Sequence, residues 1–224
     1  MHYIRFTQHD VDDVIKFLKN DPHALQMVEA NLLLNKDEAL AFVKGMFPEA
    51  IASGVSYLAK TDAHEVVAVR LSTFRTREEA AEEAQGLPYE NLSTKLERTL
   101  AMLRTLHQQF WAAMDPTINK VYFLMAVLVS EKYRGTDLVD NLIHHNMDEI
   151  RTTGVEGLAA DAAIFHSQRV LEEFGYRVVA EVDRATFLDS EATEHSSDQY
   201  GNDKVRLAYK EMWRDESVGA HVSF

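Results

Sequence analysis

Residues 121–139 of the chain read VYFLMAVLVSEKYRGTDLV, an apolar run followed by a polar loop and the start of a second apolar pattern. Val121 to Val129 is apolar except for one tyrosine hydroxyl, which is typical of a strand buried on both faces. Gly135 to Arg151 then carries apolar residues at helical spacing. The sequence therefore predicts a central strand that passes through a tight turn into a helix, whose first N–H groups have no partner within the helix.

The loop from Ser130 to Thr136, between this strand and this helix, has features of an anion site. N–H groups at a helix N-terminus converge, and the helix dipole adds partial positive charge, so the combination suits a pyrophosphate. An ordinary strand–helix connection explains the same pattern equally well, because phosphate-binding loops of the glycine-rich type contain more glycine. The local pattern leaves both interpretations open.

The flanking sequence predicts one α/β domain over residues 1–224, because we find no repeat and no linker. Strands are expected from the apolar patterns at residues 2–7, 53–60, 65–73, 157–163, 176–187 and 204–212. Helices are expected at residues 10–18, 24–34, 36–46, 92–114, 135–151 and 167–174. Residues 75–90 are expected to form an exposed insertion with an acidic helical stretch, and residues 189–203 a mobile polar loop.

Composition narrows the classes of function. Acidic residues outnumber basic ones 36 to 23, which gives a formal net charge of −13. Such a surface repels phosphate backbones, so general nucleic-acid binding is not expected. The chain has no cysteine, which excludes disulfides, thiolate metal ligands and cysteine nucleophiles. We see no secretory signal and no apolar run of membrane-spanning length, so we expect a cytoplasmic protein without membrane contact.

Ten histidines raise the question of a metal site. His144 and His145 are adjacent on a predicted helix and point in different directions, and His166 and His195 have no partners at ligand spacing. Zinc needs three or four converging ligands, so no metal site is expected. His107 lies among apolar residues of the predicted long helix, and we interpret it as a packed surface histidine rather than a base.

The loop also resembles a motif of a known family. The run from Val127 through Leu142 resembles the acyl-CoA-binding motif of the GNAT N-acetyltransferase superfamily, whose pattern is Arg/Gln-x-x-Gly-x-Gly/Ala. Arg134 matches the first position, whereas Asp137 stands at the glycine and Val139 at the final glycine or alanine. Glycine lets the backbone approach a pyrophosphate, and aspartate adds bulk and negative charge there.

Two further segments resemble the insect arylalkylamine (dopamine) N-acetyltransferases. The pattern S-x-R-V-x-E-x-x-G-Y at residues 167–176 is similar to their fourth-helix signature, and FLKNDP at residues 17–22 resembles their segment that ends in Glu-Pro. The order of the expected elements also matches over roughly the whole chain. The resemblance implies the GNAT acyl-CoA N-acyltransferase fold of the α/β (α+β) class, a mixed central sheet of about seven strands flanked by helices.

The resemblance also implies a role for individual residues, with acetyl-CoA as co-substrate and a small primary amine as acceptor. An arylalkylamine is favoured, and polyamines remain open. The backbone is implied to pair with the pantetheine arm at Val127, Leu128 and Val129. N–H groups are implied to face the pyrophosphate at Arg134, Gly135, Thr136, Asp137, Leu138 and Val139. Asp21 occupies the position of the family's catalytic glutamate, and Ser167 that of a serine near the thioester sulfur.

Each of the two side-chain candidates has a structural alternative. Asp21 would remove a proton from the amine as a general base, or it would cap the following helix. Ser167 would protonate the leaving thiolate, but it also stands where a helix N-cap belongs, and we prefer the cap. Leu171 fills the place of the tyrosine that many GNAT enzymes use as an acid, so a tyrosine acid is absent.

Two functions therefore follow from the sequence. The first is an acetyl-CoA-dependent N-acetyltransferase in which the amine attacks the thioester directly. The second is a non-catalytic relative that keeps the fold as a binding or scaffold module, an interpretation favoured by the substituted positions Asp137, Val139 and Asp21 and by the missing tyrosine. No sequence pattern indicates an oligomeric interface.

Overall fold

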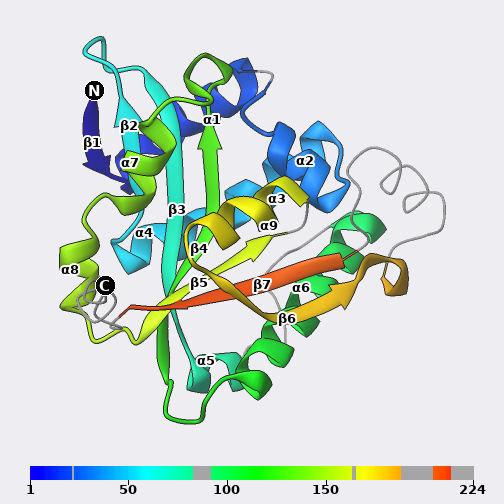
Figure 1. The fold of residues 1–224 in the computed structure, drawn as a ribbon. Helices are drawn as coiled ribbons and strands as arrows, with labels where there is room; N and C mark the ends of the chain where they lie inside the picture. The colour runs from blue at the N-terminus through cyan, green and yellow to red at the C-terminus, as the bar shows by residue number, and fades with distance from the viewer. Residues whose placement is uncertain (22, 83–91, 163–164, 188–203, 213–224) are drawn as a thin grey trace, which may run out of the picture.

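The computed structural model describes residues 1–21, 23–82, 92–162, 165–187 and 204–212 (Figure 1). Within these residues a seven-stranded sheet has the order β1-β2-β3-β4-β5-β7-β6. Its strands are β1 (His2–Arg5), β2 (Tyr57–Lys60), β3 (Val66–Thr76), β4 (Lys120–Val129), β5 (Gly157–Ala162), β6 (Arg177–Asp183) and β7 (Lys204–Glu211). Neighbouring strands are antiparallel except β4 and β5, which are parallel. The predicted mixed sheet of about seven strands is confirmed.

Helices cover both faces of the sheet (Figure 1). Those on one face share the main core with alternate side chains of the strands, and they are α1 (Val11–Asn20), α2 (Gln26–Leu32), α3 (Lys36–Gly45), α4 (Phe47–Ser53) and α6 (Thr94–Ala113). Those on the other face form smaller clusters, and they are α7 (Leu138–His144), α8 (Met147–Arg151) and α9 (Phe165–Glu173). Short elements complete the described chain: η1 (Gln8–Asp10), α5 (Arg77–Glu82), η3 (Glu131–Tyr133) and η4 (Arg184–Thr186). Period-two alternation in the strands thus divides the side chains between two layers.

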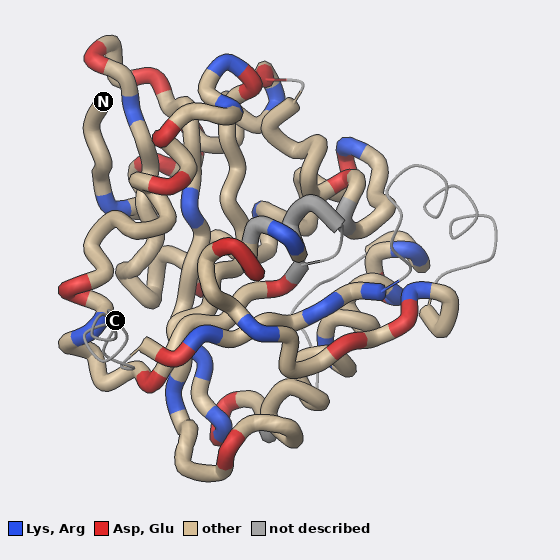
Figure 2. The backbone as a smooth tube through the Cα atoms, in the orientation of Figure 1, with Lys and Arg blue, Asp and Glu red and all other residues tan. Residues whose placement is uncertain are grey.

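Charged residues on β6 and β7, the two strands at one edge of the sheet, form ion pairs with one another. Basic residues lie along β7, and an acidic residue on β6 lies opposite them, as the backbone coloured by charge shows (Figure 2). Lys204 and Arg206 both form ion pairs with Glu181. Hydrogen bonds from these cations outweigh the small effect of burial and lower the pKa of Glu181. The charges of this edge therefore neutralise one another locally.

The sequence analysis did not predict α4. The helix expected over residues 36–46 is α3, which ends at Gly45, but a further helix begins at Phe47 and takes Pro48 into its first turn. Proline is tolerated there because the N–H that it lacks would have no partner in any case. The strand expected from residue 53 consequently begins only at Tyr57, after Gly54 ends α4 in the left-handed region with φ 67°. The expected insertion over residues 75–90 is described only to residue 82, and the expected loop over residues 189–203 lies outside the described residues.

The single helix predicted over residues 135–151 is two helices. Between α7 and α8, Asn146 takes the left-handed conformation with φ 64°. Next to it, the ring of His145 packs against Tyr3 and Tyr57, with centroid distances of 4.9 and 4.7 Å. These tertiary contacts are not visible in the apolar spacing, which continues across the break.

The two parallel strands separate after a short stretch of pairing. β4 and β5 are paired only from Val121–Gly157 to Leu124–Ala160. Beyond Leu124, β4 continues beside β3 alone, and the β3–β4 register shifts so that Met125 has no opposite residue. Such a bulge bends a strand and increases its twist. The strands therefore diverge from their shared end, as Figure 1 shows, and the edge of β4 beyond Leu124 lacks a strand partner among the described residues.

A buried arginine holds the C-terminal end of α7 against the sheet. The side chain of Arg70, in β3, is 0 % exposed. Its Nη1 donates to the carbonyl oxygens of Leu142, Ile143 and His145 at 2.8, 2.8 and 2.9 Å, and its Nη2 to that of Val55 at 3.1 Å. The last carbonyls of a helix lack intrahelical donors, and the helix dipole favours a cation there. Arg70 thus fixes where α7 ends.

The surroundings of Arg70 stabilise its charge without a carboxylate. Its guanidinium carbon lies 5.1 Å from the ring centroid of Tyr57 and 5.8 Å from that of Tyr122. No ion pair of Arg70 is found within the described ranges. Burial lowers the pKa of Arg70, while the two tyrosines act in the opposite direction. Carbonyl dipoles and ring faces therefore solvate this cation.

Replacing Arg70 with methionine is expected to destabilise the fold strongly. Methionine fills much of the same space but leaves buried carbonyl oxygens without donors, so we expect a loss of about 2–4 kcal/mol in the free energy of unfolding. Urea unfolding followed by circular dichroism measures it as a lower midpoint with an unchanged slope. Arg169→Met is the matched control, because Arg169 is exposed and pairs with Glu173 one turn away. It should lose less than about 0.5 kcal/mol, and equal losses in both variants would contradict the capping role.

Candidate active site

A cavity of about 1000 Å³ passes through the sheet where β4 and β5 separate. Residues from both faces line it. On one side these are Arg134, Gly135, Thr136, Val139, Ile143 and Phe174, and on the other Phe42, Leu103, His107, Phe110 and Trp111. Between them the wall is formed by β4 from Phe123 to Val127 and by Ala160 and Asp161 of β5. The cavity therefore connects the loop after β4 with a chamber beneath α6.

The loop after β4 uses part of its hydrogen-bonding capacity internally. The N–H of Arg134 donates to the carbonyl of Glu131 at 3.1 Å, and that of Thr136 to the carbonyl of Tyr133 at 3.4 Å. The N–H of Leu138 donates to the hydroxyl of Thr136 at 3.3 Å. The resemblance implied that every N–H group from residue 134 to 139 faces a ligand. Three of these groups instead donate within the loop.

Three N–H groups between residues 134 and 139 remain without a partner in the described chain. They belong to Gly135, Asp137 and Val139. Gly135 lies in the left-handed region with φ 69°, a conformation that glycine adopts without strain. An added Cβ at Gly135 would meet no atom within 4 Å, so the backbone is open on this side. Half of the six N–H groups that the resemblance implied, those of Gly135, Asp137 and Val139, are therefore free to donate to a ligand.

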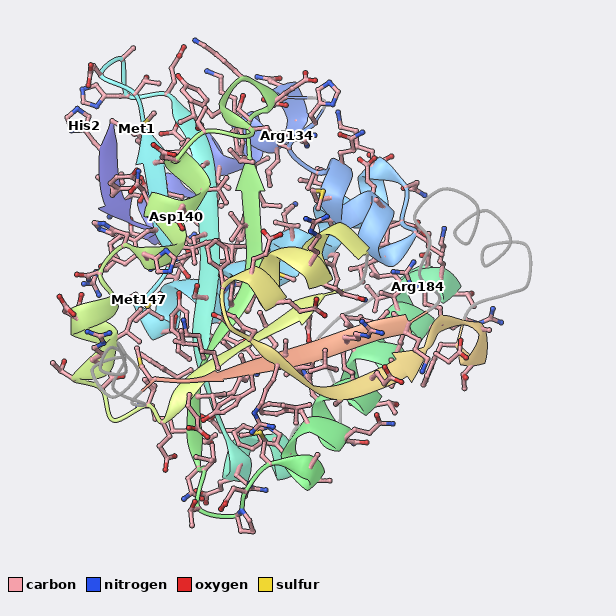
Figure 3. All side chains as sticks on the ribbon, viewed as in Figure 1. Met1, His2, Arg134, Asp140, Met147 and Arg184 are labelled. Carbon is pink, nitrogen blue, oxygen red and sulfur yellow. The ribbon has the colours of Figure 1, made fainter. Side chains whose placement is uncertain are left out.

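The two acidic residues of this region differ in their surroundings. Asp137 is exposed and is not among the residues that line the cavity, although Thr136 and Val139 on either side are. Asp140, on α7, does line it and pairs with His144 at 3.1 Å (Figure 3). The aspartate at the motif's glycine position consequently does not fill the cavity.

Arg134 ties the loop to the N-terminal helices. Its side chain lies beside the end of β4 (Figure 3). Its Nη2 donates to the carbonyl of His23 at 2.6 Å and its Nη1 to Oε1 of Gln26 at 2.9 Å. A second link is the 2.8 Å ion-pair contact between His23 and Glu131. The guanidinium at the first motif position thus cross-links two segments of the protein.

The edge of β4 runs along the cavity between these two ends. Val127 and Val129 line it, whereas the side chain of Leu128 is buried in the core. All three are paired with β3 on the other side. An open strand edge presents N–H and carbonyl groups that an extended ligand can pair with. The predicted pantetheine-binding segment therefore lies next to the cavity.

Asp21 lies apart from the cavity-lining residues. It follows α1, its Oδ1 accepts from the N–H of His23 at 2.9 Å, and its side chain hydrogen-bonds to Ser130. Partial burial raises the pKa of Asp21, but these hydrogen bonds and the nearby His23 outweigh burial and leave the pKa below its usual value. Since Ser130 is six residues beyond Leu124, it lies about 20 Å along an extended strand from the point where the strands separate. The structure therefore gives Asp21 the geometry of a turn residue.

The helix that carries the second candidate starts earlier than predicted. Ser167 is the third residue of α9, which begins at Phe165, so the N-cap interpretation of Ser167 is wrong. Leu171 lines the cavity and is buried. The position of the acid tyrosine of many relatives is therefore an apolar part of the wall.

A histidine–aspartate pair in the cavity was missed by the sequence analysis. Nε2 of His107, on α6, lies 3.1 Å from Oδ2 of Asp161, on β5, and both residues line the cavity. The other carboxylate oxygen of Asp161 is buried and has no donor among the described residues. The partners are 54 residues apart, so spacing could not reveal them. The one signal was a charged residue inside the otherwise small and apolar stretch GLAADA at residues 157–162.

The chamber beneath α6 has mainly apolar and aromatic walls. They are formed by Val28, Leu32, Phe42, Leu100, Leu103, Phe110, Trp111, Phe123 and Leu207. The ring of His107 meets that of Phe123 edge-on at 5.1 Å. Arg75 lines the same chamber and pairs with Glu49 at 2.9 Å. Such walls bind an apolar body and leave few positions for charge.

Comparison with known proteins identifies the fold. None of the family models and none of the curated proteins matches the chain. Among solved structures, a mutant agmatine N-acetyltransferase in its apo form matches with a TM-score of 0.67 at 14 % identity, over 94 % of this chain and 99 % of that one. A mosquito arylalkylamine N-acetyltransferase (like 5b) gives 0.66 at 15 %, and a Drosophila melanogaster polyamine N-acetyltransferase 0.66 at 14 %, with the same coverage. The chain therefore has the GNAT fold, and that prediction is confirmed.

No described helix combines the length and the hydropathy that a membrane span requires. No three histidine, aspartate or glutamate side chains in the described part are grouped so as to hold a metal ion.

Proposed function

We propose that the chain is an acetyl-CoA-dependent N-acetyltransferase for a small primary amine, with an arylalkylamine as the favoured acceptor. The observation that carries this proposal is the cavity that joins the loop after β4 to the aromatic chamber through the gap between β4 and β5. Transfer between a long donor and a small acceptor requires that both reach one point, and a passage through the sheet lets them arrive from opposite faces.

The donor half of the cavity fits the shape and chemistry of acetyl-CoA. The pantetheine arm is an extended chain with two amides, which matches the open edge of β4 at Val127 to Val129. The N–H groups of Gly135 and Asp137 are available for phosphate oxygens. The bound thioester would supply the acetyl group near Met125, where the bulge turns β4 away from β5. These residues bind and orient the donor.

The acceptor half favours a monocation with an aromatic body. Aromatic side chains dominate its walls, and Asp161 supplies a carboxylate for an ammonium group. Glu49 is paired with Arg75, and Arg104 adds another positive charge to the wall. A dication such as agmatine requires a second anionic contact at its far end. The solved neighbours include enzymes named for both kinds of amine, and they therefore do not distinguish between the two. The charges of this chamber are what support an arylalkylamine over agmatine.

Acetyl-CoA is expected to raise the midpoint of thermal unfolding. A ligand that binds only the folded chain stabilises it, by about 2.7 kcal/mol at one hundred times its dissociation constant. Asp137→Gly should increase the ligand-induced shift, because it removes a negative charge beside the phosphate donors. Asp148→Gly removes a charge from α8, where Asp148 is 94 % exposed, and should leave the ligand-induced shift unchanged.

The outcomes of this experiment separate the two functions. A shift only in Asp137→Gly would identify the aspartate as the cause of lost binding and would favour a non-catalytic module. No shift in either protein would contradict acetyl-CoA as the donor.

Among acceptors, arylalkylamines are expected to be the better substrates. With acetyl-CoA saturating, thiol release should show kcat/KM values for tyramine, dopamine or serotonin at least about 10-fold above that for agmatine, the size that a changed pocket contact commonly produces. Release without amine is the control for hydrolysis. A preference for agmatine or spermidine would contradict the acceptor assignment, and binding of acetyl-CoA without release for any amine would favour the binding-module function.

A further inference from the structure

We propose that Asp161 and His107 together form the group that binds the acceptor's ammonium and takes up its proton. This inference rests on the proposed function and deepens it, because it assigns the acid–base step to the half-buried carboxylate–imidazole contact on the described cavity wall. Asp161 would touch the amine, and His107 would share the proton through Asp161.

The position of Asp161 follows from the strand pairing. Ala160 is the last residue of β5 paired with β4, so Asp161 is the first residue beyond the point of separation. Alternation along β5 places Ala159 in the main core beneath α6 and Ala160 in the cluster beneath α9. Asp161 therefore points to the same face as Ala159, the face of the acceptor chamber. It stands where the two halves of the cavity meet.

The carboxylate of Asp161 has unused capacity to accept hydrogen bonds. An ionised carboxylate accepts about four, and Asp161 makes one, to His107, within the described chain. A buried carboxylate oxygen without a donor is costly, so a ligand that brings donors is favoured. An ammonium group brings three. The side chain of Asp161 is 20 % exposed, and since the residue lines the cavity it is accessible to a ligand there.

Among the described residues, Asp161 is the hydrogen-bond partner of the His107 imidazole. Its side chain is 26 % exposed, and its ring is packed edge-on against Phe123. The charged groups that face it are Asp161 from β5, the Arg75–Glu49 pair from β3 and α4, and Arg104 one turn earlier on α6. From β7 the neighbouring wall is apolar, formed by Val205 and Leu207. Asp161 is thus the one carboxylate of this set that bonds to the imidazole.

The protons and electrons of the step balance as follows. The amine enters as an ammonium ion and gives one proton to the Asp161–His107 pair. The freed lone pair forms the bond to the thioester carbonyl carbon, and the carbon–sulfur bond breaks. The departing thiolate receives the second proton from the nitrogen, and the pair returns the first to solvent. The products are the N-acetyl amine, free thiol and one proton, with no change of oxidation state.

Asp21 is the competing assignment, and distance separates the two. Asp21 is bonded to Ser130 near the far end of β4, whereas Asp161 adjoins Ala160, the partner of Leu124. One amine cannot reach both carboxylates from a single position. Variants of the two residues therefore test alternative sites for the same proton.

The decisive experiment compares Asp161→Asn, His107→Gln and Asp21→Asn in the full chain, with tyramine as acceptor. We expect Asp161→Asn to lower kcat at least about 100-fold and to raise the KM for tyramine, as loss of a positioned base does. His107→Gln should lower kcat less and flatten the fall of kcat/KM at acidic pH. The double variant should be no worse than Asp161→Asn alone, because the two act as one unit. Asp21→Asn should keep kcat within about threefold.

Controls separate this inference from folding and from the proposed function. Every variant should keep the thermal shift with acetyl-CoA, and Asp148→Asn and His9→Gln, on exposed residues, should match the wild type. A kcat of Asp161→Asn within threefold of the wild type contradicts the proposed pair, and so do additive losses of kcat in the double variant. A loss of kcat in Asp21→Asn alone assigns the general base to Asp21 instead. A wild-type chain that binds acetyl-CoA but releases no thiol overturns the proposed function and the pair with it.

Discussion

The contact on which the donor half of the site depends is the buried guanidinium of Arg70 at the end of α7. α7 has only seven residues, and a helix this short is unstable without tertiary support. Arg70 supplies that support from the middle of the sheet, by satisfying carbonyl groups that would otherwise be buried without donors. At the other end of the loop, Arg134 is bonded to the segment after α1. The loop after β4 is thus fixed by two arginines, neither of which has to contact a phosphate.

A third arginine serves the acceptor half in the same way. Arg77 donates to the carbonyl oxygens of Trp111, Asp115 and Ile118 at 2.6, 3.0 and 3.1 Å. These groups lie at and after the end of α6, where a cation is favoured by the helix dipole. Since α6 carries His107, the cap at Arg77 positions the chamber wall relative to β3 and β4. α6 and α7, which both border the cavity, are thus each held at their C-terminal carbonyl groups by an arginine side chain.

The sequence predicted those elements whose position follows from the burial pattern of their own residues. The continuous apolar run of β4, the alternation in β7 and the apolar spacing of α6 each follow from burial, and each is found. The break between α7 and α8 was missed because it depends on Arg70 and His145 contacts with distant strands. The His107–Asp161 pair was missed for the same reason, since its two members gain their chemistry only when β5 and α6 are brought together. Asp21 was assigned from a resemblance of position, which carries no information on which groups its carboxylate would meet.

The exposure of Asp137 decides how much the altered motif costs. Two unit charges 4 Å apart interact by about 1 kcal/mol in water but by about 4 kcal/mol at the effective dielectric constant near a protein surface. Because Asp137 is exposed and outside the cavity lining, the lower figure applies, and a factor of roughly ten in affinity corresponds to about 1.4 kcal/mol. Under the proposed function, an aspartate at this position would therefore weaken the binding of a diphosphate by about tenfold or less, and it leaves the backbone N–H that the glycine would also have offered. The departure from the GNAT motif thus predicts a lower affinity rather than the loss of the proposed function.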